Sequence, residues 1–94
     1  MIEVQKISGI SEFSTKKEKE RELYLRGEKT FLVVNKNSIE VRCEKNLKKL
    51  LVSKYESVME SRYFGRGGIE VVMSGQLSES EIEDLVRLSY NLSE

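Results

Sequence analysis

The middle of the chain alternates between apolar and polar side chains, which is typical of β-strands. Three short runs rich in β-branched and aromatic residues follow one another, at residues 22–26, 30–35 and 38–43. Between them, Gly27 can adopt the positive φ of a tight turn, and Asn37 can supply the side-chain hydrogen bonds of a second turn. The pattern therefore predicts a three-stranded antiparallel meander.

The third run has the most regular alternation, so its two faces can be assigned from the sequence. The inward set is Ile39, Val41 and Cys43, and the outward set is Glu40, Arg42 and Glu44. We expect the first face to be buried and the second to be exposed to water. Cys43, the only cysteine of the chain, is interpreted as a core residue rather than a reactive thiol.

After Cys43 the apolar period changes from two to about 3.6 residues, which predicts an amphipathic helix. Its apolar stripe is Leu47, Leu50, Leu51 and Tyr55, and its outer arc carries Lys45, Lys48, Lys49 and Lys54. A second helix is predicted to begin after Ser78, with Ser78 as its N-cap and Glu81 as the capping-box partner. The apolar stripe of this second helix is Ile82, Leu85, Val86 and Leu92, with Leu88 or Ser89 between them.

The remaining segments have weaker patterns. Residues 1–10 predict a short strand or an irregular segment. Residues 11–22 carry charges of alternating sign without an apolar stripe, which favours a solvated helix turn or loop over a basic arm that binds phosphate. Residues 57–64 are expected to form an extended connection that leads to a strand at residues 69–73.

These elements predict a single small α+β domain over residues 1–94. Its sheet would be an antiparallel meander of three strands plus a fourth strand, covered by two amphipathic helices. Residues 1–21 would be an N-terminal segment that is either flexible or different from the corresponding segment of related proteins.

The segment RYFGRGG precedes the last predicted strand and allows three interpretations. A P-loop needs a helix directly after its glycines, and here a strand follows, so a phosphate cradle is disfavoured. A turn in which Gly67 and Gly68 adopt positive φ is favoured. An exposed loop that presents Arg62 and Arg66 to phosphate, with Tyr63 or Phe64 stacking on a base, is the third interpretation.

Composition excludes several kinds of chemistry. The chain has no histidine and a single cysteine, which excludes His-based nucleophile arrangements, an intrachain disulfide and a thiolate zinc site built from this chain alone. We therefore predict no enzymatic activity, no cofactor and no metal site. No apolar run approaches the roughly 20 residues of a membrane span, so we expect a cytoplasmic location and no membrane partner.

Charge is balanced over the chain but unevenly distributed. Sixteen basic and 16 acidic residues give a net charge of zero, yet residues 1–50 have four excess positive charges and residues 51–94 four excess negative charges. A nucleic-acid-binding surface would therefore have to be local. The same asymmetry could instead serve self-association, with the positive half of one copy against the negative half of another.

The order of the elements and three ordered motifs resemble the MmcQ/YjbR family of small bacterial proteins, over about residues 22–92. The stretch YLRGEKTFLVV is similar to the family's F-x-V-x-G-K-x-F-A, and SIEVRCEKNLKKLL is similar to its strand-to-helix passage. The stretch from Val71 through Tyr90, which includes the closing helix, is similar to the family's C-terminal pattern, with Gly75, Leu77, Leu85, Ser89 and Tyr90 at matching positions. The chain departs from the family at residues 63–69, which lack its Y-H-x-N-K-x-H-W segment. The TfoX N-terminal domain, which shares the meander followed by a helix, is the second resemblance.

Members of the MmcQ/YjbR family are commonly described as DNA-binding by likeness to a double-wing β architecture, which is an analogy of fold. The resemblance implies a YjbR-like fold and a module that binds DNA or another nucleic acid mainly through phosphate. The candidate contact residues are Lys45, Lys48, Lys49, Arg62, Tyr63 and Arg66. The alternative is a protein-interaction or homodimerising module that binds no nucleic acid and catalyses no reaction.

Overall fold

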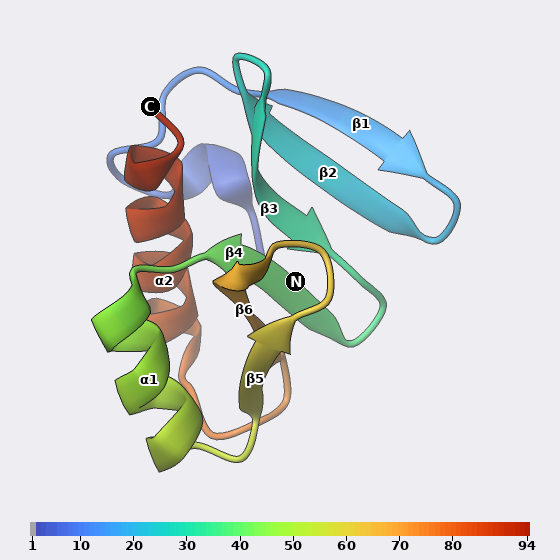
Figure 1. Cartoon of the computed structure of the whole chain (residues 1–94). Coiled ribbons are helices and arrows are strands. Elements are labelled where there is room, and N and C mark those ends of the chain that lie inside the picture. The colour runs from blue at the N-terminus through green and yellow to red at the C-terminus, as the bar shows by residue number, and fades with distance from the viewer. Residues whose placement is uncertain (1) are drawn as a thin grey trace.

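The computed structural model describes residues 2–94, and in it two helices lie on one side of a six-stranded antiparallel sheet (Figure 1). The strands are β1 (Ser14–Glu18), β2 (Arg21–Arg26), β3 (Lys29–Val34), β4 (Ser38–Arg42), β5 (Val58–Ser61) and β6 (Gly65–Val72), and the helices are α1 (Lys45–Lys54) and α2 (Glu79–Leu92). The strand order is β1-β2-β3-β4-β6-β5, so α1 carries the chain from β4 to the far edge of the sheet. The predicted α+β class is confirmed, and the predicted number of strands is wrong.

The two additional strands lie at the edges of the sheet, where the sequence carries no apolar alternation. Residues 14–18, expected in a helix turn or loop, form β1, which pairs with β2 from Ser14 opposite Leu25 to Glu18 opposite Arg21. Four of its five side chains are exposed, so neither face needs apolar residues. Strand β5 occupies the segment expected to be an extended connection, and it pairs with β6.

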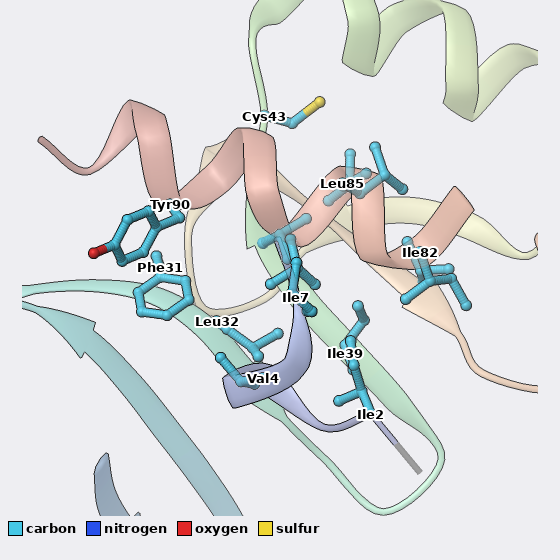
Figure 2. Close-up of a cluster of buried hydrophobic side chains, with 14 of the residues drawn as sticks. Ile2, Val4, Ile7, Phe31, Leu32, Ile39, Cys43, Ile82, Leu85 and Tyr90 are labelled. Atoms are coloured by element: carbon cyan, nitrogen blue, oxygen red, sulfur yellow. The ribbon is translucent and has the colours of Figure 1, made fainter. Parts of the chain in front are cut away.

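The N-terminal segment packs onto the same side of the sheet as α2. Residues 4–6 form one turn of 3₁₀ helix, and Ile2, Val4, Ile7 and Ile10 are buried in the main core. Figure 2 shows Val4 and Ile7 beside core residues of the sheet. Part of the segment 1–21, for which we expected flexibility or divergence from the family, thus contributes four side chains to the core.

The predicted meander is present as β2, β3 and β4, and Gly27 has φ 63° in the turn between the first two. Beneath α2, the core face of the sheet contains Ile39 and Val41 of β4 beside Ile69 and Val71 of β6. These side chains alternate with polar ones along both strands, so one face of the sheet is apolar and is buried beneath the helices.

Helix α2 begins as predicted and is joined to the sheet by a buried serine. Ser78 and Glu81 form the reciprocal capping box. The hydroxyl of Ser89 donates a hydrogen bond to the carbonyl of Phe31 (2.6 Å) and accepts one from the backbone N–H of Arg42 (2.8 Å). Ser89 therefore occupies the buried position for which Leu88 was the alternative, and it fixes α2 against β3 and β4.

The predicted apolar stripes are only partly buried. Leu50 of α1 and Leu92 of α2 were expected to face the core, and both are exposed. Helix α1 has no fully buried residue, although Leu47, Leu51 and Tyr55 pack against the edge of the core. Within residues 2–94, no helix is both long enough and apolar enough to span a membrane.

Candidate nucleic-acid interface

Four of the six candidate contact residues lie around one depression between α1 and the start of β6. Lys45, Lys48 and Lys49 come from the first turns of α1, and Arg66 comes from β6. Spacings of three and four residues place the three lysines on neighbouring positions of the helix. The carboxylate of Glu44 accepts hydrogen bonds from two backbone N–H groups of the first turn and fixes where the helix begins. We call the surface of Lys45, Lys48, Lys49 and Arg66 the basic surface.

Lys48 joins the two elements of the basic surface. Its ammonium group donates hydrogen bonds to the Glu60 carboxylate (2.9 Å) and to the carbonyls of Gly65 (3.3 Å) and Arg66 (3.1 Å). Its side chain is only 15% exposed. The hydrogen bond and charge of Lys48 hold the pKa of Glu60 below its usual value. Lys48 is therefore a positioning residue, which holds the backbone of Arg66 against α1.

The other three cations of the basic surface face solvent. Lys45, Lys49 and Arg66 are all exposed. Among the ion pairs formed within residues 2–94, none involves these three side chains. Among the described residues, Glu60 is the only acidic one that lines the depression, and its carboxylate is paired with Lys48. The surface thus has a local excess of positive charge on a chain whose net charge is zero.

Arg62 and Tyr63, the other two candidates, lie on the face of the sheet that the helices do not cover. The Arg62 guanidinium donates two hydrogen bonds to the Glu70 carboxylate, at 3.0 and 2.9 Å. The Tyr63 hydroxyl is 3.2 Å from that of Thr30, and the guanidinium of Arg21 lies 5.1 Å from the centre of its ring. The structure does not bring Arg62 and Tyr63 to the basic surface.

Only residues 62–64 of the RYFGRGG segment form the turn between β5 and β6, and Gly65–Gly68 already belong to β6. The predicted turn is therefore shorter than expected, and its glycines have other roles. Gly65, not Gly67 or Gly68, has positive φ (61°). Gly68 is required for packing: a Cβ placed there would lie 2.5 Å from the carbonyl oxygen of Val41 and 2.7 Å from the Cβ of Phe64.

A buried pair of carboxylates on the uncovered face is the polar feature that sequence reasoning missed. Glu40 of β4 and Glu70 of β6 stand directly opposite each other and are 1% and 5% exposed. Glu40 was expected to face water. It is buried because the β5–β6 turn, with Tyr63 and Phe64, folds over this part of the sheet. The sequence shows that Glu40 and Glu70 each lie within an otherwise apolar strand, which was the available signal. That the two residues lie opposite each other follows only from the register of β4 with β6.

Both carboxylates are held by donors from the chain itself. Glu40 accepts hydrogen bonds from the Asn35 amide (2.9 Å), the Ser61 hydroxyl (2.8 Å) and the Tyr63 backbone N–H (2.8 Å). Glu70 accepts from the Ser38 hydroxyl (2.6 Å) in addition to Arg62. No buried side-chain nitrogen or oxygen within residues 2–94 lacks a hydrogen-bond partner. This arrangement favours a structural role, in which the carboxylates fix the β5–β6 turn.

Acid is expected to destabilise the fold through Glu40. Burial raises the pKa of this carboxyl, but the hydrogen bonds from Asn35, Tyr63 and Ser61 outweigh burial and lower the pKa below its usual value of 4.5. A lowered pKa in the folded state gives stability that is present above pH 4.5 and is lost as pH falls through the folded-state pKa. Urea unfolding at a series of pH values should show this loss, with a shallower slope in Glu40→Gln; equal slopes would contradict the assignment.

No protein-family model matches the chain, and no curated protein or solved structure matches it. The resemblance to the MmcQ/YjbR family therefore stays a prediction from motifs and element order.

Proposed function

We propose that this chain is an MmcQ/YjbR-like nucleic-acid-binding module that contacts phosphate groups through the basic surface. The observation that supports this proposal is the convergence of three exposed cations, Lys45, Lys49 and Arg66, from two separate elements around one depression. Lys48 holds the two elements of the basic surface together through its hydrogen bonds to the Glu60 carboxylate and the Arg66 carbonyl. Arg62 and Tyr63 are left out of the proposed interface because their polar groups have partners on the other face of the sheet.

Binding of this kind would read the backbone of the nucleic acid rather than its bases. Lysine and arginine side chains neutralise phosphate charge and release counterions, whereas sequence is read by hydrogen bonds in the grooves. A surface of three exposed cations is small, so we expect a dissociation constant in the roughly 10⁻⁴ to 10⁻⁶ M range of non-specific binders. The proposed role requires no catalysis and no cofactor, and it is compatible with the predicted cytoplasmic location.

Salt dependence is the measurement that tests the proposal. If Lys45, Lys49 and Arg66 each neutralise one phosphate, affinity for duplex DNA should fall about 40-fold between roughly 50 and 200 mM salt. The affinity should be measured by fluorescence anisotropy with a labelled duplex of mixed sequence. The triple variant Lys45→Ala, Lys49→Ala, Arg66→Ala should lose most of this binding and nearly all of its salt dependence.

A matched control removes the same charge elsewhere. The variant Lys16→Ala, Lys17→Ala, Lys36→Ala changes three exposed lysines outside the basic surface. It should bind DNA as the unaltered chain does, apart from a weak, long-range effect of net charge. Equal losses in the two triple variants would contradict a localised interface, and so would the absence of binding at low salt.

The alternative, a protein-interaction or homodimerising module, is favoured by a different observation. The helices expose large apolar side chains, among them Leu50, Leu88 and Leu92. Leu88 and Leu92 line a different depression from the one proposed to bind phosphate.

A further inference from the structure

An apolar strip runs along the outer sides of the two helices. Leu50 of α1 is 59% exposed, and Leu88 and Leu92 of α2 are 46% and 51% exposed. Leu88 and Leu92 are one helical turn apart, and Leu47 lies three residues before Leu50, so each helix presents a pair of leucines along one line. We call Leu47, Leu50, Leu88 and Leu92 the leucine strip.

Three of the four residues of the leucine strip line a depression between the helices. Leu47, Leu88 and Leu92 line it together with Cys43 and Leu85, which are buried at its base. The first turns of α1 therefore lie beside the second half of α2. At the other end, hydrogen bonds with Ser78 and, to a smaller extent, the charge of Lys54 lower the pKa of Glu81 in the first turn of α2. The helices thus run side by side in opposite directions, as Figure 1 also shows.

The two helices carry opposite charge. Helix α1 contains four lysines and no acidic residue, whereas α2 contains four acidic residues and one arginine. Asp84 is one turn before Leu88 on α2, and Lys54 is four residues after Leu50 on α1. Because the helices run in opposite directions, these two charged side chains lie at the same end of the leucine strip. The strip is therefore apolar along its length, with a positive helix on one side and a negative helix on the other.

We propose that the leucine strip is a homodimer interface, in which α1 of each copy packs against α2 of the other about a two-fold axis parallel to the helices. An isologous interface requires a self-complementary surface, and this rotation places each positive helix opposite a negative one. It also covers the exposed leucines of both copies. A polyanion such as nucleic acid would be attracted by α1 but repelled by α2, which makes it a poorer occupant of the strip.

Self-association should be measured first, by sedimentation equilibrium over a wide range of protein concentration. The unaltered chain should form a dimer, and Leu88→Lys with Leu92→Lys should raise its dissociation constant about 100-fold or more. Both leucines are exposed, so the variant should fold, which circular dichroism and urea unfolding can verify. Met59→Lys is the control, because Met59 is similarly exposed (41%) on the uncovered face of the sheet; it should leave the dimer unchanged.

Charge exchange tests the arrangement of the helices. One variant carries Lys54→Glu on α1, and the other carries Asp84→Lys on α2; both positions are exposed and lie at the charged end of the leucine strip. Each variant alone would place like charges across the interface and should be monomeric at low salt. When the two variants are mixed, the altered α1 of one copy meets the altered α2 of the other, and the two unaltered helices meet each other. Both helix pairs then carry opposite charges, so a heterodimer should form.

Four results would overturn the proposal. The first is a monomeric unaltered chain at millimolar concentration, and the second is a dimer that Leu88→Lys with Leu92→Lys does not weaken. The third is failure of the two charge variants to associate when mixed, which would exclude the pairing of α1 with α2. Binding of the strip to anionic lipid vesicles in place of self-association would identify a different occupant and would also overturn it.

The dimer and the nucleic-acid interface can fail independently. Lys45 and Arg66 line the depression on the side of α1 that faces β6, whereas Leu47 lines the depression that faces α2. The Lys45→Ala, Lys49→Ala, Arg66→Ala variant should therefore retain leucine-mediated dimerisation. If both proposals hold, one particle would carry two basic surfaces, and a duplex long enough to reach both would bind more tightly than a short one.

Discussion

Replacing Glu40 by alanine is expected to lower the free energy of unfolding by about 3 kcal/mol, although the sequence places Glu40 at an outward position of a strand. The substitution removes the acceptor for the Asn35 amide, the Ser61 hydroxyl and the Tyr63 backbone N–H. Ser61 is 2% exposed, so water cannot readily take the place of the carboxylate. A loss of this size is a large share of the roughly 5 to 15 kcal/mol typical of a small domain.

Urea unfolding at neutral pH, followed by circular dichroism, would measure this effect. Glu56→Ala is the control, because it removes a carboxylate from an exposed position and should change the free energy by less than about 0.5 kcal/mol. Glu40→Gln should fall between the two, since its amide oxygen can still accept hydrogen bonds while its NH₂ group meets the Asn35 amide. If Glu40→Ala proves as mild as Glu56→Ala, the β5–β6 turn is not held by this carboxylate.

The elements that the sequence predicted are those that bury one apolar face. The meander from β2 to β4 and the capped start of α2 follow from period-two and period-3.6 patterns and from the Ser78–Glu81 spacing. Strand β1 has four exposed side chains of five and contains no apolar residue, so hydrophobic periodicity could not reveal it. Its pairing with β2 depends on backbone hydrogen bonds, to which every sequence has nearly equal access.

The candidate interface was predictable to the extent that it lies on one helix. Lys45, Lys48 and Lys49 are neighbours because of helical spacing alone. Arg66 joins them only because α1 packs beside the β5–β6 hairpin, where Lys48 reaches its carbonyl. Arg62, four residues earlier, lies across the sheet against Glu70, and no local pattern could separate the two arginines.

The two faces of the sheet therefore carry different kinds of side chains. On the uncovered face, buried carboxylates are paired with hydroxyl, amide and guanidinium donors, which fixes the turn that leads into β6. On the other side, the helices expose leucines and two lysines, Lys45 and Lys49, that form no ion pair within residues 2–94. Because strand β6 begins at this turn, we expect the hydrogen-bond network on one face to help position Arg66 on the other. Loosening the turn should weaken the proposed phosphate contacts as well as the fold.

Gly68→Ala is expected to destabilise the chain by about 3 kcal/mol, the upper end of the usual cost of overpacking. Its Cβ would lie 2.5 Å from the carbonyl oxygen of Val41 and 2.7 Å from the Cβ of Phe64. The carbonyl belongs to the paired strand β4, so it cannot move without disturbing the ladder. Phe64 cannot move freely either, because its ring lies against the guanidinium of Arg42, 5.0 Å from the ring centre.

Gly67→Ala provides the matched control, one residue away in the same strand. A Cβ at Gly67 would have Phe64 O, at 3.7 Å, as its only neighbour within 4 Å, which is ordinary van der Waals contact, and its φ is not positive. Urea unfolding should therefore show little change for Gly67→Ala and a large loss for Gly68→Ala. If the two variants unfold alike, Phe64 does not pack on β6 as described. If only Gly68→Ala is destabilised and it also loses DNA affinity, the β5–β6 turn positions Arg66.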